Sequence, residues 1–196
     1  MMKYTLVCMA LFLTFAANAQ NFHFGPKLDL NYSALKGDGV KNKYSAGFQV
    51  GGFAEYSFTK HWSIQPELLY TWNPYKKSND FLTYYNNSGR SAAGTNINLA
   101  YVSVPVLARY NFNKYLSVMA GPQFSYLTFE DEDLLKEDRK AFEKTEVSAN
   151  LGVQVNLDKV GFYARYNKGL TDINDVDDRY TWKSSHVQIG IAVRIM

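Results

Sequence analysis

The residue types best suited to catalysis lie near the end of the chain, where His186 follows Ser184 and Ser185 and comes shortly after Asp172. A hydroxyl nucleophile, an imidazole base and a carboxylate that orients the base form a hydrolase site when they lie within hydrogen-bond reach. A single histidine in a segment rich in Asp and Ser is usually just solvated. We therefore expect no catalytic residues, and a hydrolase at the outer rim is the least favoured function.

Metal and cofactor sites are not expected either. His23 and His61 fall on the opposite side of the predicted fold from His186, and three scattered histidines make a poor metal site. A group of aspartates near the end of the chain could bind calcium but lacks the twelve-residue loop pattern of an EF-hand. Its members are Asp172, Asp175, Asp177 and Asp178. Cys8, the single cysteine, lies in the leader described below, so disulfides and thiolate sites are excluded from the mature chain.

Seven charged residues fall on the polar positions of alternating segments. They are Lys27, Asp29, Glu55, Glu67, Arg109, Arg165 and Arg194. If these positions face an interior, the charges must pair or be hydrated, because an isolated ion in a low-dielectric interior costs several kcal/mol. We predict that they form a structural ion-pair network. A conducting pore or a ligand channel is the alternative.

The segments that carry these charges alternate strictly, most clearly over residues 186–195. The five odd positions are Val or Ile, and the even positions are His, Gln, Gly, Ala and Arg. This period of two is that of a β-strand. A polar face with an arginine does not suit a buried core strand, and a row of β-branched residues does not suit water. Both faces fit a membrane barrel in which the aliphatic row contacts lipid and the polar row turns inward.

The same alternation predicts eight strands along the chain. They cover residues 22–32, 46–58, 62–72, 100–112, 115–129, 147–157, 160–170 and 186–195. The connections alternate between long and short, which is the topology of a bacterial outer-membrane barrel with its short turns and both termini in the periplasm. We predict an all-β fold, an eight-stranded antiparallel up-and-down transmembrane β-barrel. The interior of such a barrel is only wide enough to be filled by side chains.

Aromatic residues on the outward positions fall into two predicted girdles, one for each membrane interface. Those near the short turns are Phe22, Tyr56, Phe58, Trp62, Tyr110 and Phe112, and those near the long loops are Tyr32, Tyr70, Trp72 and Tyr126. A soluble lipocalin-like barrel is the alternative fold. Its apolar row would face inward, and Arg109, Arg165 and Arg194 would then face water.

The N-terminus has the pattern of a secretory signal. Lys3 gives a positive start, residues 4–15 are apolar, and Ala17-Asn18-Ala19 is a small-x-small cleavage site. We expect a signal peptide over residues 1–19 and one barrel domain over residues 20–196. The apolar run is shorter than the roughly 20 residues of a membrane-spanning helix. Without Lys3, 20 Lys and Arg oppose 18 Asp and Glu, which gives no electrostatic case for nucleic acid.

Several short motifs go beyond alternation. They are Tyr101, Pro105, Arg109-Tyr110, Asn113-Lys114 and Ala120-Gly121-Pro122, with support from Gly25, Lys27, Gln65-Pro66-Glu67-Leu68, Arg165-Tyr166 and residues 169–173. On these motifs the chain resembles the PorT-like outer-membrane β-barrel family of Bacteroidetes. The resemblance implies a barrel in the cell outer membrane. Most members have no assigned activity, and the namesake is associated with protein secretion, a role that these barrel-building motifs do not transfer. The chain departs from the usual pattern by ending in Met196 rather than an aromatic residue.

We therefore predict a non-enzymatic outer-membrane protein that is structural, adhesive or an accessory to an envelope or secretion complex. Its expected partners are outer-membrane lipid and an envelope protein that contacts the surface loops or the periplasmic turns. The barrel is expected to be monomeric. The alternative function is a narrow channel or a small-ligand binding barrel.

Overall fold

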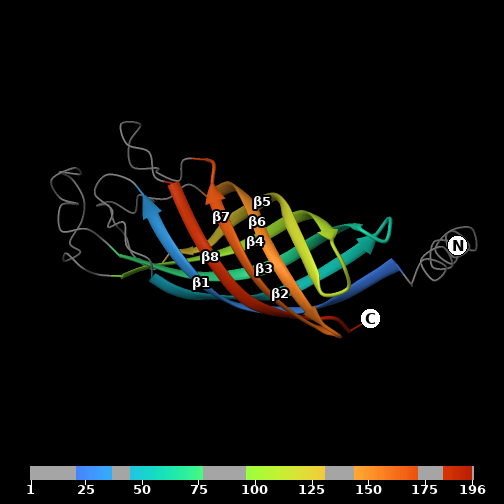
Figure 1. Cartoon of the computed structure of the whole chain (residues 1–196). Helices are drawn as coiled ribbons and strands as arrows, with labels where there is room; N and C mark the ends of the chain where they lie inside the picture. Colours follow the sequence, from blue (N-terminus) through green and yellow to red (C-terminus); the bar gives the residue numbers. More distant parts are fainter. Residues whose placement is uncertain (1–20, 37–44, 77–95, 131–143, 172–182, 196) are drawn as a thin grey trace, which may run out of the picture.

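The alternating segments form β-strands in the computed structural model, which describes residues 21–36, 45–76, 96–130, 144–171 and 183–195. The strands are β1 (Phe22–Lys36), β2 (Ser45–Ser57), β3 (Trp62–Lys76), β4 (Asn96–Asn111), β5 (Leu116–Glu130), β6 (Thr145–Leu157), β7 (Val160–Gly169) and β8 (Lys183–Val193). Each strand is antiparallel to the next, and β8 pairs with β1, which closes the barrel (Figure 1). The predicted eight-stranded barrel is confirmed.

The three short turns lie together at one end of the barrel, and each has a local chemical cause (Figure 1). Thr59 Oγ1 accepts the backbone N–H of Trp62 at 3.0 Å, and Asn113 Oδ1 accepts that of Leu116 at 2.9 Å. Such side-chain to backbone bonds are typical of Ser, Thr and Asn in turns. Asp158 has a φ of 55°, the left-handed conformation that a two-residue hairpin turn requires. We call this the turn end of the barrel and the opposite one the outer end.

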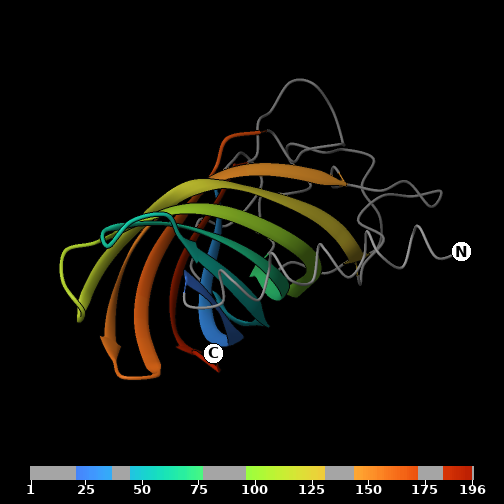
Figure 2. The ribbon, with the colours of Figure 1, turned by 90° about the vertical axis from the view of Figure 1, so that its right-hand side faces the viewer.

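Alternation places apolar side chains outside and polar side chains inside. Leu68, Leu151 and Ile189 on the outer face are 61%, 64% and 56% exposed, whereas the inward Gln65 and Ser117 are fully buried. This is the reverse of a soluble barrel, so the lipocalin-like alternative is wrong. In the view of Figure 2 the strands curve around a common interior. Among the described residues, no helix is long and apolar enough to cross a membrane.

The outward aromatic residues gather near the two ends of the strands. At the turn end the Tyr110 ring packs against Trp62 and Phe112, with centroids 4.9 and 5.1 Å apart. At the outer end Trp72 stacks on Phe129 at 5.9 Å. These clusters lie where the predicted girdles place them, and Phe129 is an addition to the outer one.

Phe129 faces outward because of a bulge that alternation does not predict. Ala100 pairs with Phe129 but Tyr101 pairs with Leu127, so Thr128 is an extra residue in β5. The Thr128 hydroxyl donates to the carbonyl of Ala100 at 3.0 Å. The extra residue reverses the facing of the side chains that follow it. Leu127, before the bulge, is buried in the lumen, whereas Phe129, after it, is 47% exposed.

Several strands extend further toward the outer end than the apolar pattern predicts. β3 continues to Lys76 and β4 begins at Asn96, and these two residues pair with each other. The predicted strands end at Trp72 and begin at Ala100. Backbone hydrogen bonds need no apolar side chain, so pairing continues beyond the lipid-facing band. The predicted signal peptide, residues 1–19, lies outside the described residues.

Candidate functional site

The candidate site is the barrel lumen, where charged residues from distant parts of the sequence meet. Glu67 of β3 accepts Lys27 Nζ of β1 at 2.7 Å and both terminal nitrogens of Arg165 of β7 at 2.9 and 3.0 Å. The side chain of Gln65 adds a donor at 2.7 Å. All three charged side chains are fully buried. β3 and β7 are four strands apart in a ring of eight, so the bidentate ion pair crosses the lumen from wall to wall.

Asp29 and Tyr163 extend this central cluster. The Tyr163 hydroxyl donates to Asp29 Oδ2 at 2.5 Å. The ring of Tyr163 lies under two cations, with Lys27 Nζ 4.1 Å and Arg165 Cζ 5.3 Å from its centroid. Gly190 on the neighbouring strand makes room for the pair, because a Cβ there would lie 2.3 Å from the Asp29 Cβ. The central cluster therefore contains two acids, two cations and one buried phenol.

A second cluster lies nearer the turn end and is built around Arg109. Its Nη1 donates to Glu55 at 3.3 Å and to Gln65 at 2.9 Å. The remaining donors reach Ser117 at 2.8 Å, Asn156 at 3.0 Å and Asn111 at 3.1 Å. Glu55 also accepts the hydroxyl of Ser63 at 2.9 Å. The guanidinium group of Arg109 is thus fully occupied, as a buried arginine requires.

Arg194 differs from the other six predicted lumen charges. It lies just beyond β8 at the mouth of the turn end, and 32% of its side chain is exposed. One guanidinium nitrogen approaches Glu55 at 3.6 Å, which is an ion pair but too long for a hydrogen bond. The structure therefore divides the seven charges into a central group of Lys27, Asp29, Glu67 and Arg165, and a turn-end group of Glu55, Arg109 and Arg194.

Apolar side chains are also buried in the lumen. Leu69, Leu107 and Met119 are 0–1% exposed, and Phe53 and Tyr163 are almost as deeply buried. The sulfur of Met119 lies 3.4 Å from a terminal nitrogen of Arg165, so apolar and charged groups pack directly against each other. The middle of the lumen is consequently filled by side chains, as expected for eight strands.

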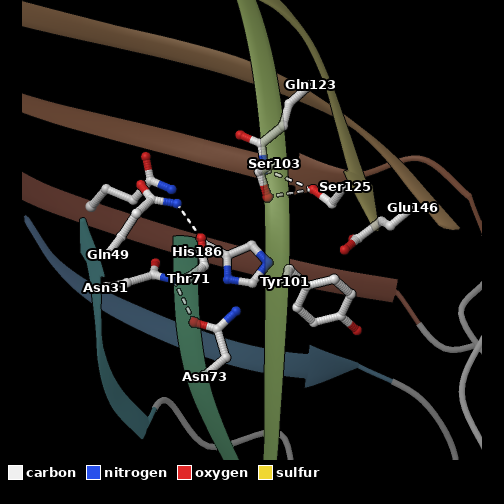
Figure 3. A pocket seen from close by; sticks show the side chains of 11 residues that line it. Asn31, Gln49, Thr71, Asn73, Tyr101, Ser103, Gln123, Ser125, Glu146 and His186 are labelled. Carbon is white, nitrogen blue, oxygen red and sulfur yellow. Dashed lines mark hydrogen bonds between the residues drawn. The ribbon is translucent and has the colours of Figure 1, made fainter. Parts of the chain in front are cut away.

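The outer half of the lumen is a smaller polar chamber, shown in Figure 3. Its side chains bond to one another across strands, for example Gln49 to Thr71 at 2.5 Å and Ser103 to Ser125 at 2.9 Å. The remaining cavity measures about 10 Å³, which is close to the smallest space that holds one water molecule. Hydrogen bonding among the wall residues leaves no room for a substrate.

Glu146 is a buried lumen residue that sequence reasoning missed. It is 5% exposed and accepts a hydrogen bond from the hydroxyl of Ser184. The predicted strand began at Val147, whereas β6 begins at Thr145. Extending the alternation by one residue would have identified Glu146 as an inward position. With it, the described lumen carries four acids and four cations.

The residues considered for a hydrolase do not assemble into one. His186 is buried, and its Nδ1 lies 3.0 Å from the hydroxyl of Ser33 rather than that of Ser184. Ser184 bonds Glu146 instead. Asp172 lies outside the described residues, as do the other three aspartates of the candidate calcium group. In the described ranges, no three His, Cys, Asp or Glu side chains come together in a way that could hold a metal ion.

A closed barrel of eight antiparallel strands, with an apolar outer face and a polar, side-chain-filled lumen, defines an outer-membrane β-barrel protein. Residues 18–175 match the family model described as the outer membrane protein beta-barrel domain, and the chain belongs to this family. The protein therefore resides in the outer membrane. No curated protein matches the chain.

Among the solved structures that share this fold are Ail and Neisserial surface protein A. Ail, the attachment invasion locus protein of Yersinia pestis, solved with the heparin analogue sucrose octasulfate, is 17% identical with a TM-score of 0.54. The match covers 89% of this chain and 99% of Ail. Neisserial surface protein A is 14% identical with a TM-score of 0.52, covering 87% of this chain and 96% of that protein. At these identities the likeness concerns the fold alone.

Proposed function

We propose that this protein is a non-enzymatic, monomeric outer-membrane barrel whose filled lumen stiffens the wall and whose connections present a surface to a partner. The observation that supports this proposal is the bidentate ion pair between Glu67 and Arg165, which joins opposite walls of the barrel and to which Lys27 adds a second cation. A buried pair of this kind holds its partners in one geometry, since separating them would leave unpaired charges in a dry interior.

The filled middle and outer half of the lumen support a scaffold rather than a channel or a barrel that binds a ligand in that part of its interior. A solute crossing the barrel would have to displace the central cluster together with Met119, which is packed against it, and the buried Leu107. The outer chamber leaves only about 10 Å³. Recognition by this barrel would then take place on the connections at its two ends, where a structural, adhesive or accessory role would be exerted.

Two likenesses bear on which of these roles applies. Ail is named for attachment and invasion, and its fold similarity favours the adhesive role for the outer connections. The resemblance to the PorT-like barrels of Bacteroidetes rests on barrel-building motifs and does not by itself favour the role of an accessory to an envelope or secretion complex. The export of the chain through a cleaved signal peptide over residues 1–19 belongs to the same proposal.

Conductance in planar lipid bilayers tests the scaffold proposal. The purified, refolded barrel is expected to produce no conductance steps above those of protein-free detergent, with a bacterial porin as the positive control. E67Q provides the matched variant, because it changes the charge of the central cluster at nearly constant volume. Stepwise conductance in the wild type that changes size in E67Q would instead establish a narrow channel.

Replacement of a connection separates the adhesive role from the other two. Residues 131–143, between β5 and β6, are replaced by a Gly-Ser linker, and the control variant is D158N in the short turn between β6 and β7. If the role is adhesive, cells carrying the linker variant lose attachment to host cells while cells carrying D158N retain it. Attachment that is equal in both, together with a protein that co-purifies after crosslinking, would favour an accessory role.

A further inference from the structure

The turn end of the barrel is hollow, in contrast to the filled outer half. A cavity of about 350 Å³ opens there, against about 10 Å³ in the outer chamber. Residues of β1, β2, β4 and β6 line it together with two of the short turns and the segment after β8. Pockets that bind small molecules start at about 300 Å³. In an outer-membrane barrel this end faces the periplasm, so the cavity is accessible from that compartment.

The lining of this cavity is strongly basic. Four of the lining side chains are cations and one is a carboxylate; the cations are Lys60, Arg109, Lys114 and Arg194, and the carboxylate is Glu55. The cavity therefore has a formal charge of +3 with neutral histidines. A concave site lined by charges of one sign focuses the field and raises the local concentration of counter-ions. The charge thus selects anions.

The contacts show which of these groups remain available. Arg109 on the floor uses its donors within the wall, and Glu55 is already engaged by Arg109 and by Ser63. The guanidinium of Arg194, in contrast, is partly exposed, and its polar contact among the described residues is the 3.6 Å approach to Glu55. His23 also lines the cavity, and its buried Nδ1 has no hydrogen-bond partner in the described part of the chain. Lys60 is exposed in the turn between β2 and β3.

We propose that this periplasmic mouth binds a small multivalent oxyanion bearing a phosphate group. The guanidinium of Arg194 presents a planar set of donors that matches phosphate oxygens. Lys60 adds a positive charge at the rim, and His23 forms part of the wall. Arg109 and Glu55 form the rigid floor beneath them. The phosphate would come from a soluble periplasmic compound or from the headgroup of an inner-leaflet phospholipid.

Titration with inorganic pyrophosphate tests this proposal on the folded barrel in micelles of an uncharged maltoside detergent. Isothermal titration calorimetry should show saturable binding that weakens as sodium chloride is raised, because the site is partly exposed and ionic. R194Q should weaken binding at least tenfold and K60Q severalfold. The control is K168Q, which removes an exposed lysine of β7 near the outer end and should leave binding unchanged.

Two further measurements keep the test decisive. Each variant is run heated and unheated on a gel to establish that the barrel has formed; if R194Q does not fold, K60Q in the exposed turn carries the test. Nanodiscs with and without phosphatidylglycerol distinguish the two sources of phosphate. Equal pyrophosphate affinity in both supports a soluble ligand, and weaker affinity with phosphatidylglycerol supports a headgroup. Absence of saturable binding, or binding of equal strength in the folded R194Q and K60Q variants, would overturn the proposal.

Discussion

Replacing Glu67 by Gln exchanges one carboxylate oxygen for an NH₂ group. This substitution should destabilise the barrel more than any other equally small change in the lumen. The carboxylate of Glu67 is the common acceptor for Lys27 and Arg165, at 2.7 to 3.0 Å, and all three side chains are fully buried. Glutamine keeps the shape and one oxygen but removes the charge and turns an NH₂ group toward two cations. Asp29 then remains as the one acid of the central cluster.

The expected loss can be estimated from the contacts. Breaking a buried ion pair by removing one partner costs about 3–5 kcal/mol, because it leaves an uncompensated charge in a low-dielectric interior. Two of the lost bonds are charge-assisted, and each such bond contributes about 1.5–3 kcal/mol. The two estimates agree. Such a loss is a large part of the 5–15 kcal/mol by which folded proteins are typically stable.

The assay is reversible unfolding of the refolded barrel by guanidinium chloride in lipid vesicles, followed by tryptophan fluorescence. D158N in the exposed short turn is the control and should change the free energy of unfolding by less than about 0.5 kcal/mol. The double variant K27M/E67Q removes one cation with the acid and leaves Arg165 with Asp29, so it should be more stable than E67Q alone. A change below about 1 kcal/mol in E67Q would show that the lumen is hydrated and would refute the proposed scaffold role of the central cluster.

Three further predictions concern the lipid-facing wall, the pairing of β8 with β1 that closes the barrel, and the outer chamber. L151R places a charge on the lipid face of β6, where Leu151 is 64% exposed, and should cost about 2–4 kcal/mol in vesicles; an unchanged unfolding midpoint would contradict the lipid-facing assignment. G25V should abolish the fast-migrating unheated band on gels, because a Cβ at Gly25 would lie 1.7 Å from the carbonyl oxygen of Val193 where β8 closes on β1. S184A should cost about 1–3 kcal/mol of unfolding free energy by removing the hydroxyl that bonds the buried Glu146, and a variant as stable as the wild type would show that water replaces that hydroxyl.

The candidate site was predictable from the sequence only in part. Period-two alternation placed Lys27, Glu67 and Arg165 on inward positions, because in a strand every second side chain shares a face. The alternation did not distinguish Arg194 from Arg165, because both residues fall on inward positions and differ only in their height along the barrel. The height of a residue along the barrel depends on how its strand is registered against the neighbouring strands. The contacts of its side chain depend on which other side chains reach across the lumen.

What the amino-acid sequence determined by itself was the class of fold, the two faces of each strand and the end at which the turns lie. These follow from local chemistry, since lipid and lumen demand opposite side chains and the short turns contain Thr59, Asn113 and Asp158. What only the tertiary structure decided was the pairing of Glu67 with Arg165, 98 residues apart, the bulge at Thr128 and the hollow beside Arg194. The ion pair and the hollow depend on closure of β8 onto β1, because only a closed ring brings β3 opposite β7 and leaves one end of the lumen filled and the other open. The bulge depends on the register of β5 against β4.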